Sequence, residues 1–389
     1  MNKISPDKRR LILHDLLEGC SQRSCERKHD VSNNTIAKVF RDAGDMAIAK
    51  VSEIRDLESR VIQADELFSF VGAKQKNVER MRRPSPDAGT AWCYLAEDAE
   101  SKFVIDYRIG SRSVYDATEF MRSVSSRLKR DEHGRFAVRP TIVTDGLPAY
   151  KEACQIAFGT DADVGMLIKK YSKVDENGEL LPGSRYIGAD RVPIIGSPRF
   201  DLIHTGYIER TNLNVRMDCR RFGRQTNAFS KTLMNHKRHV ALWVFYTNFC
   251  RIPKCLGITP AMAAGVTDHI WEVTDMLDLT DTFIADRLKA QIGWGDEAEE
   301  ETLPEGEPTH WVYRSELHYK ATVHEADCFH FKRGAGHGRG NARAGQWLPF
   351  YSQEDALAAA AQFEPDRHNT CNVCIGSYRN AGGYRGPRG

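Results

Sequence analysis

The amino-acid sequence predicts an α/β protein, and three observations lead to that prediction. Between Val61 and Phe249, short β-branched apolar runs typical of strands alternate with longer segments of helical spacing. Residues 5–45 carry three short helical patterns, and residues 310–376 carry His and Cys pairs at the spacing of a metal site. With 389 residues, of which 41% are hydrophobic, the chain is long enough for roughly two to four domains.

The amino-terminal segment, residues 1–50, is expected to bind DNA. Helices are predicted at Lys8–Glu18, Gln22–His29 and Asn33–Ala43, the last with Ser32 as its N-cap. The apolar residues of the third helix face inward, which leaves a polar outer face of Asn33, Asn34, Thr35, Lys38 and Arg41. This is the layout of a helix-turn-helix whose third helix enters the major groove. A small helical bundle used for protein contacts is the alternative.

The central segment, residues 58–280, is expected to form the catalytic core. Its predicted elements are the strands Val61–Asp65, Ala91–Leu95 and Phe103–Ile109, the helix Tyr115–Leu128, the strand Thr141–Thr144, a helix from Pro148 to about Phe158, the strand Val164–Lys169 and a helical region from His204 to Cys250. This is the order of an RNase H-like core, in which the first and fourth strands end side by side. Residues 172–200 hold four Gly and three Pro, and we expect them to be an insertion.

Three acidic residues of this core are the candidate catalytic residues. Asp65 and Asp145 each follow an apolar strand pattern, and Glu209 shares one face of a predicted helix with Asn212 and Arg216. Three carboxylates placed in this way can hold two divalent cations, as two-metal phosphoryl transfer requires. Taken singly, each residue has another interpretation: a cap or turn residue for the aspartates, and a solvent-facing side chain for Glu209.

The distribution of charge favours a nucleic-acid partner. The formal net charge is only +2, but residues 205–255 hold ten Lys or Arg against two acids. Residues 294–309 are expected to be a flexible linker, because seven acids and no Lys or Arg lie between positions 296 and 307. We find neither an apolar run long enough to span a membrane nor a signal peptide at the start. We therefore expect a cytoplasmic, nucleoid-associated protein.

Several motifs resemble those of the insertion-sequence-one (IS-one) transposases, bacterial members of the DDE class. The three blocks are Asp65-Glu-Leu-Phe-Ser-Phe-Val71, Thr144-Asp-Gly-Leu-Pro-Ala-Tyr150, and His204 followed by Glu209-Arg-x-Asn. A segment from Phe249 to Gly265 is similar to the one that closes such cores, so the resemblance covers roughly residues 5–280. It implies that Asp65, Asp145 and Glu209 bind two Mg²⁺ or Mn²⁺ ions per active site. It also implies that Arg216 grips DNA, and Arg210 and Asn212 are candidate DNA contacts in the same block.

The function that this resemblance implies is DNA transposition. The helix-turn-helix would bind the terminal inverted repeats of an insertion sequence, and the core would cleave a strand and transfer it to double-stranded target DNA. A homo-oligomer assembled on DNA is expected. Two alternatives remain open at this point: an RNase H-like nuclease that cuts without joining, and a domesticated DNA-binding regulator.

The carboxy-terminal segment, residues 310–376, is expected to bind a structural Zn²⁺. His324 and Cys328 form one ligand pair, and Cys371 and Cys374 form a second, which together complete a tetrahedron. His330 competes for the fourth position, and His337 is a more distant candidate. The order of ligands, strand and Ser352-capped helix resembles the zinc module of the bacterial methyl-phosphotriester repair protein. A metal-free module with reduced thiols is the alternative, and residues 377–389 are expected to be a disordered basic tail.

Overall fold

The computed structural model describes residues 4–174, 180–223, 226–293, 310–315, 320–325, 345–350, 352–363 and 368–370. The chain divides into two compact units. The first unit comprises Met1–Ser69, Trp92–Phe229 and Lys237–Ala285, and the second comprises Phe70–Ala91, Ser230–His236 and Asp286–Gly389. Among the described helices, none is both long enough and apolar enough to cross a membrane.

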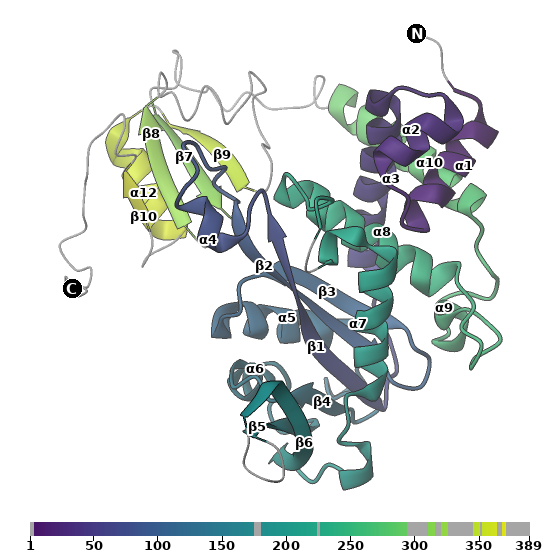
Figure 1. Ribbon diagram of the computed structural model, residues 1–389, viewed down its shortest axis with the longest axis vertical. Coiled ribbons are helices and arrows are strands. Elements are labelled where there is room, and N and C mark those ends of the chain that lie inside the picture. Colours follow the sequence, from purple (N-terminus) through teal and green to yellow (C-terminus); the bar gives the residue numbers. More distant parts are fainter. Residues whose placement is uncertain are drawn as a thin grey trace. The chain divides into compact units, whose positions relative to one another are not determined.

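A six-stranded mixed sheet forms the centre of the first unit, in the order β3-β2-β1-β4-β5-β6 (Figure 1). The strands are β1 (Val61–Val71), β2 (Gly89–Asp98), β3 (Val104–Gly110), β4 (Thr141–Asp145), β5 (Asp163–Val174) and β6 (Leu180–Ile195). β4 pairs in parallel with β1 and with β5, whereas β2 with β3 and β5 with β6 are antiparallel. This arrangement is compatible with an RNase H-like core.

Strand β1 is buried along almost its whole length, as expected of a strand that other elements cover on both faces. Helices α5 (Val114–Arg127) and α6 (Ala149–Phe158) pack against the β2 side chain of Tyr94. The Tyr94 ring lies 5.4 Å from that of Phe120 on α5 and 6.2 Å from that of Tyr150 on α6. Helix α7 (Gly206–Asp218) docks on β1 through hydrogen bonds to Gln63.

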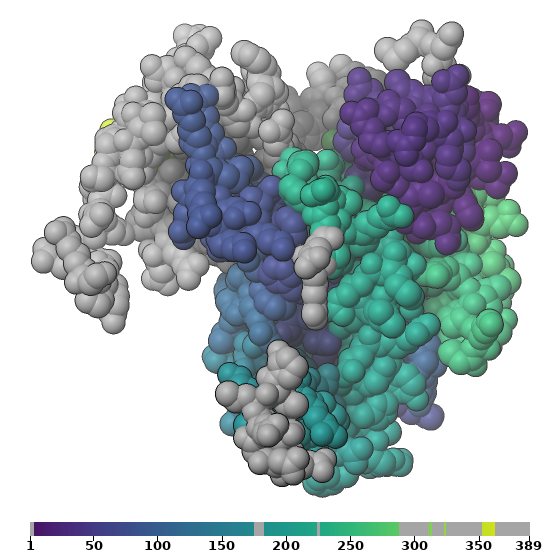
Figure 2. Space-filling view, in the orientation of Figure 1, coloured from purple at the N-terminus to yellow at the C-terminus, as the bar shows by residue number. Residues whose placement is uncertain are grey.

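Three helices precede the sheet: α1 (Pro6–Leu17), α2 (Gln22–His29) and α3 (Asn33–Glu53). Each begins after a serine whose hydroxyl accepts a backbone N–H hydrogen bond. Their surface is purple in Figure 2. Helix α3 is ten residues longer than predicted, because Gly44 does not end it. A Cβ at Gly44 would lie 2.6 Å from the Cβ of Arg238, so the glycine permits close packing on α8 (Leu233–Phe249).

Further helices lie outside the carboxy-terminal segment. They are α4 (Gln75–Val78), α9 (Pro260–Ala263), α10 (Val273–Gly293), and the short 3₁₀ turns η1 (Phe200–Leu202) and η2 (Arg220–Phe222). The region predicted as one broken helix from His204 to Cys250 is therefore two helices, α7 and α8, separated by η2. Arg9 on α1 donates two hydrogen bonds to Asp281 on α10, which joins these two helices. Arg238 on α8 pairs with Asp45 on α3, which joins those two.

The stretch 172–200, expected as an insertion, supplies strand β6 to the central sheet. β6 pairs with β5 from Val164↔Ile195 to Val174↔Leu180. Its Gly and Pro residues suggested an insertion, but β6 is the edge strand of the sheet. An edge strand tolerates Pro193, since the missing N–H is not needed on the unpaired side.

The described part of the carboxy-terminal segment is a small α+β unit. Four strands, β7 (His310–Ser315), β8 (Lys320–Glu325), β9 (Gly345–Phe350) and β10 (His368–Thr370), form a sheet in the order β10-β8-β7-β9. Helix α12 (Gln353–Phe363) begins after Ser352, as predicted, and packs Ala356 and Ala360 on Val312 and Val323.

Of the predicted zinc ligands, His324 is the one that lies among the described residues. His324 lies on β8, opposite Trp311 of β7. Cys328, Cys371, Cys374 and the competing His330 and His337 lie outside the described residues, as do the linker 294–309 and the tail 377–389. The zinc site therefore stays a prediction.

Candidate active site

Two of the three predicted catalytic carboxylates lie side by side at the centre of the sheet. The parallel pairing of β1 with β4 sets Ala64 opposite Thr144, so the next residues, Asp65 and Asp145, are neighbours. Asp145 is the last residue of β4, as predicted. Asp65 is in the middle of β1, not at its end, because the strand pattern of apolar and aromatic residues continues to Val71.

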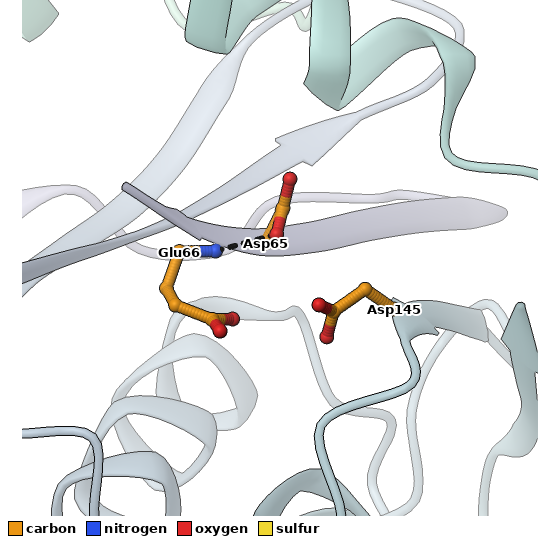
Figure 3. Close-up of side chains that lie close together, drawn as sticks. All are labelled: Asp65, Glu66 and Asp145. Atoms are coloured by element: carbon orange, nitrogen blue, oxygen red, sulfur yellow. Dashed lines mark hydrogen bonds between the residues drawn. The ribbon is translucent and has the colours of Figure 1, made fainter. Parts of the chain in front are cut away.

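A third carboxylate, that of Glu66, joins this pair and was not singled out from the sequence. One oxygen from each of Asp65, Glu66 and Asp145 lies within 4.8 Å of the other two (Figure 3). Adjacent residues of a strand point to opposite faces, which argues against such a grouping. Asp145 resolves this, because its carboxylate reaches from the neighbouring strand toward Glu66 in Figure 3. The feature that could have indicated Glu66 is the presence of an acid within a strand that is buried on both faces.

Burial and mutual repulsion raise the pKa values of these carboxylates. Burial, and then the charge of Asp145, raises the pKa of Asp65 to about 6. Burial, and then the charges of Asp145 and Asp65, raises the pKa of Glu66 to about 8, although Arg112 opposes the shift. Burial also raises the pKa of Asp145. The Glu66 side chain is 2% exposed and pairs with Arg112 at 2.6 Å.

Helix α7 is fixed to β1 by side chains at the site. The Gln63 side-chain oxygen accepts hydrogen bonds from the backbone N–H groups of Tyr207 and Ile208, at 3.0 and 3.1 Å, in the first turn of the helix. The Asn212 amide donates to Asp65 at 2.7 Å. The side-chain nitrogen of Gln63 also lies 3.3 Å from the ring nitrogen Nδ1 of His204, so this histidine is a neighbour of the start of α7.

Glu209 is placed on α7 as predicted but stands outside the group of three carboxylates. Lys169 on β5 donates to its carboxylate at 2.6 Å, and Thr205 donates a second hydrogen bond. Burial acts to raise the pKa of Glu209, but the hydrogen bonds from Lys169 and Thr205 bring it below its ordinary value. Glu209 is close enough to contribute to the raised pKa values of Asp65 and Asp145.

The predicted DNA-contacting residues occupy two separate helices. On α7, Arg210 is exposed and Arg216 is half-buried. On α3, Asn34, Lys38 and Arg41 are exposed, whereas Asn33 and Thr35 are half-buried. Lys38 also pairs with Asp42 on the same helix. These positions are consistent with the predicted outward face, and their role in DNA binding stays a prediction.

The carboxylate group fits a divalent cation. Hard oxygen ligands are what Mg²⁺ and Mn²⁺ prefer, and the three oxygens are close enough to share one ion. Two buried oxygens at the site, Glu66 Oε2 and Asn212 Oδ1, have no hydrogen-bond partner among the described residues. Unpaired buried acceptors are costly, and a cation or its bound water would satisfy them.

Comparison with known protein families finds no family model that matches the sequence, and comparison with curated proteins finds no match. One solved structure that resembles part of the chain is described as a crystal structure of a pre-cleavage Mos1 transpososome. The likeness covers 42% of this chain and 61% of that chain, at 13% sequence identity and a TM-score of 0.18. This chain thus spans about three fifths of its neighbour's length. At this TM-score the likeness carries no weight, and the fold rests on the strand order of this chain.

Proposed function

We propose that this protein is a DDE transposase that cleaves the ends of an insertion sequence and joins them to target DNA. The observation that carries the proposal is the meeting of Asp65 and Asp145, from two parallel strands, beside a helix that bears Glu209. The three motif blocks that resemble IS-one transposases supply exactly these residues in this order along the chain.

The carboxylates have a defined part in this reaction. Asp65, Asp145 and Glu209 would hold Mg²⁺ or Mn²⁺, two ions per site, and such ions activate the attacking oxygen and stabilise the leaving one. Asn212 orients Asp65 through its 2.7 Å hydrogen bond. For Glu209 to reach the other carboxylates it must exchange its contact with Lys169, and Lys169 is then free to meet a phosphate oxygen of the DNA strand.

Binding of double-stranded DNA would depend on other residues. The exposed α3 side chains Asn34, Lys38 and Arg41, with Asn33 and Thr35 beside them, would contact the terminal inverted repeats. Arg210 and Arg216 on α7 would contact phosphates near the cleaved bond. A homo-oligomer on DNA is part of the proposal, because two element ends must be brought together.

The test compares Asp145→Asn with Asp268→Asn, a matched carboxylate-to-amide change at an exposed position. The DNA substrate carries the inverted repeats that flank the gene. Mn²⁺ binding followed by electron paramagnetic resonance should fall at least tenfold in Asp145→Asn, and strand cleavage should be abolished, while binding to the repeats is retained. Asp268→Asn should behave like the wild type. Near-normal cleavage by Asp145→Asn would refute the assignment of the site.

The same protein and the same element ends also test the two alternative functions, a nuclease and a DNA-binding regulator. Pre-cut element ends with a free 3′-OH should be joined to a target plasmid by the wild-type protein. Cleavage without joining would favour an RNase H-like nuclease. Repeat binding with neither cleavage nor Mn²⁺ binding would favour a DNA-binding regulator.

A further inference from the structure

Strands β5 and β6 continue beyond the sheet as a two-stranded ribbon. β4 ends at Asp145, which pairs with Leu167 of β5. From Ile168 to Val174, β6 is the only described strand with which β5 pairs. β5 and β6 lie at one edge of the sheet in Figure 1, so the ribbon begins next to the carboxylate group. A two-stranded ribbon is only marginally stable alone, so a long one invites a functional explanation.

The ribbon exposes aromatic and apolar side chains that a protein ordinarily buries. Tyr171 is 56% exposed, Tyr186 is 57% exposed and Ile187 is 61% exposed. The two tyrosine rings face each other across the strands, 6.0 Å apart and nearly perpendicular. Clustered exposed apolar side chains mark an interaction surface, whereas isolated ones need no explanation.

The same segment is cationic. The described ribbon residues 168–174 and 180–190 contain four basic residues, Lys169, Lys170, Lys173 and Arg185, and one acid, Asp190. Asp190 pairs with Lys170. Residues 175–179, between the two strands in the sequence, contain Asp175, Glu176 and Glu179 and lie outside the described residues.

One face of β5 links these features to the site. Lys169 and Tyr171 are two residues apart, the spacing that repeats one face of a strand. The register shift beside Tyr171 adds its extra residue, Ile187, to β6, so the alternation of β5 is kept as far as Tyr171. A second shift follows between Ser172 and Val174. Lys169 is the residue that contacts Glu209, so Tyr171 lies on the strand face that looks toward α7.

We propose that the β5–β6 ribbon is a DNA-binding arm, in which the lysines contact the backbone of the strand beside the cleaved bond and Tyr171 and Tyr186 stack on an unpaired nucleotide of that strand. Cationic side chains beside aromatic rings suit a nucleic-acid strand, and a ring can reach the face of a base only where that base is unpaired. This inference rests on the proposed function, since it needs DNA at the carboxylates.

The test measures binding of the full-length protein to a duplex with a single-stranded extension that carries 2-aminopurine, in Ca²⁺ to prevent cleavage. In the wild type, stacking should quench the 2-aminopurine fluorescence. Tyr171→Ala/Tyr186→Ala should abolish the quenching and weaken binding about tenfold or more. Tyr171→Phe/Tyr186→Phe should retain both, which guards against a simple folding defect. Phe200→Ala, at a 58% exposed aromatic outside the ribbon, is the control and should bind like the wild type.

Substitutions of the lysines test the proposal independently. Lys170→Gln/Lys173→Gln should weaken binding and reduce the slope of log K against log salt by about one to two, since each lost phosphate contact removes about 0.9. Unchanged quenching in the alanine variant, or an unchanged salt slope in the glutamine variant, would overturn the proposal. A change of oligomeric state in light scattering with DNA binding intact would also overturn it and identify the ribbon as a contact between copies.

Failure of this inference and failure of the proposed function give different results. If the wild type quenches the probe but Asp145→Asn cleaves as well as the wild type does, the arm stands and the assigned active site falls. If ribbon variants bind normally while Asp145→Asn is inactive, the active site stands and the arm falls.

Discussion

At the scale of single residues, the acids of the site differ in how readily they give up a proton. Burial raises the pKa of Asp65 to about 6 and that of Glu66 to about 8, so each would lose a proton on binding a cation in the proposed site, which Glu66 would join as a further ligand. We therefore expect Mn²⁺ affinity to increase as the pH rises from 5.5 to 8.5. In Glu66→Gln the increase should be confined to the region near pH 6. Paramagnetic resonance titrations at each pH measure this, and a Glu66→Gln profile identical to the wild type would exclude Glu66 from the cation site.

Glu97 on β2 is a buried acid outside the carboxylate group, and we expect it to affect stability. It accepts a hydrogen bond from Thr211, but burial raises its pKa to about 7, and its other oxygen has no hydrogen-bond partner among the described residues. A raised pKa means that the folded state holds a proton that the unfolded state releases. The stability from Glu97 is therefore fully present below about pH 4.5 and is lost as the pH rises through about 7.

Glu97→Gln should thus stabilise the protein at pH 8, by roughly 1–3 kcal/mol, and have little effect at pH 4.5. Urea unfolding at the two pH values measures the difference. Glu100→Gln, a change at an exposed glutamate in the following turn, is the matched control. A Glu97→Gln variant with the same stability gain at both pH values would contradict the burial argument.

The sequence predicted part of this site and missed part of it for physical reasons. Asp65 and Asp145 could be paired in advance, because the predicted order of strands and helices sets the first and fourth strands side by side. Glu66 could not, because strand alternation places it on the opposite face from Asp65. The contact between Lys169 and Glu209 joins β5 to α7 and depends on how that helix docks, which no local pattern encodes.

At the scale of elements, the strands and helices with strong local patterns were predicted closely, and the differences are informative. The predicted helix Gln22–His29 matches α2 residue for residue, and Thr141–Thr144 falls one residue short of β4. Larger differences arose where tertiary contacts override local preference. β6 forms despite its Gly and Pro because β5 offers a long partner strand, and α3 continues past Gly44 because α8 packs against it.

Gly44 permits a test of that packing. Alanine is favoured over glycine within a helix by about 1 kcal/mol, so Gly44→Ala would stabilise an isolated α3. Here the new Cβ would meet Arg238 Cβ at 2.6 Å and Arg238 Cα at 3.3 Å, and the two helices would have to move apart. We expect a net loss of about 1–2 kcal/mol in the free energy of unfolding. Thermal and urea unfolding should show it.

The control for Gly44→Ala is Gly183→Ala in β6. A Cβ at Gly183 meets nothing within 4 Å, so this change should leave stability almost unaltered. If Gly44→Ala were as stable as the wild type or more so, α3 and α8 would not be in close contact in solution.

At the scale of the whole molecule, the chain combines a unit that carries the proposed active site with a second unit that carries the proposed zinc module. Among the side chains that the structure describes in that module, Val312, Val323, Ala356 and Ala360 form a buried cluster with Leu357 packed against it. Small domains commonly depend on a metal for part of their stability. The position of His324 on β8, a few residues before Cys328, suits a ligand pair at the end of a strand.

We therefore expect the purified full-length protein to contain one Zn²⁺ per chain, measured by inductively coupled plasma mass spectrometry. Cys371→Ser/Cys374→Ser should lose the zinc, because two thiolates of the tetrahedron disappear. Cys255→Ser, at an exposed cysteine of the first unit, should retain it. Zinc retained in the double variant would refute the site. Zinc lost from His330→Ala but kept in His324→Ala would instead preserve the site and assign its fourth ligand to His330.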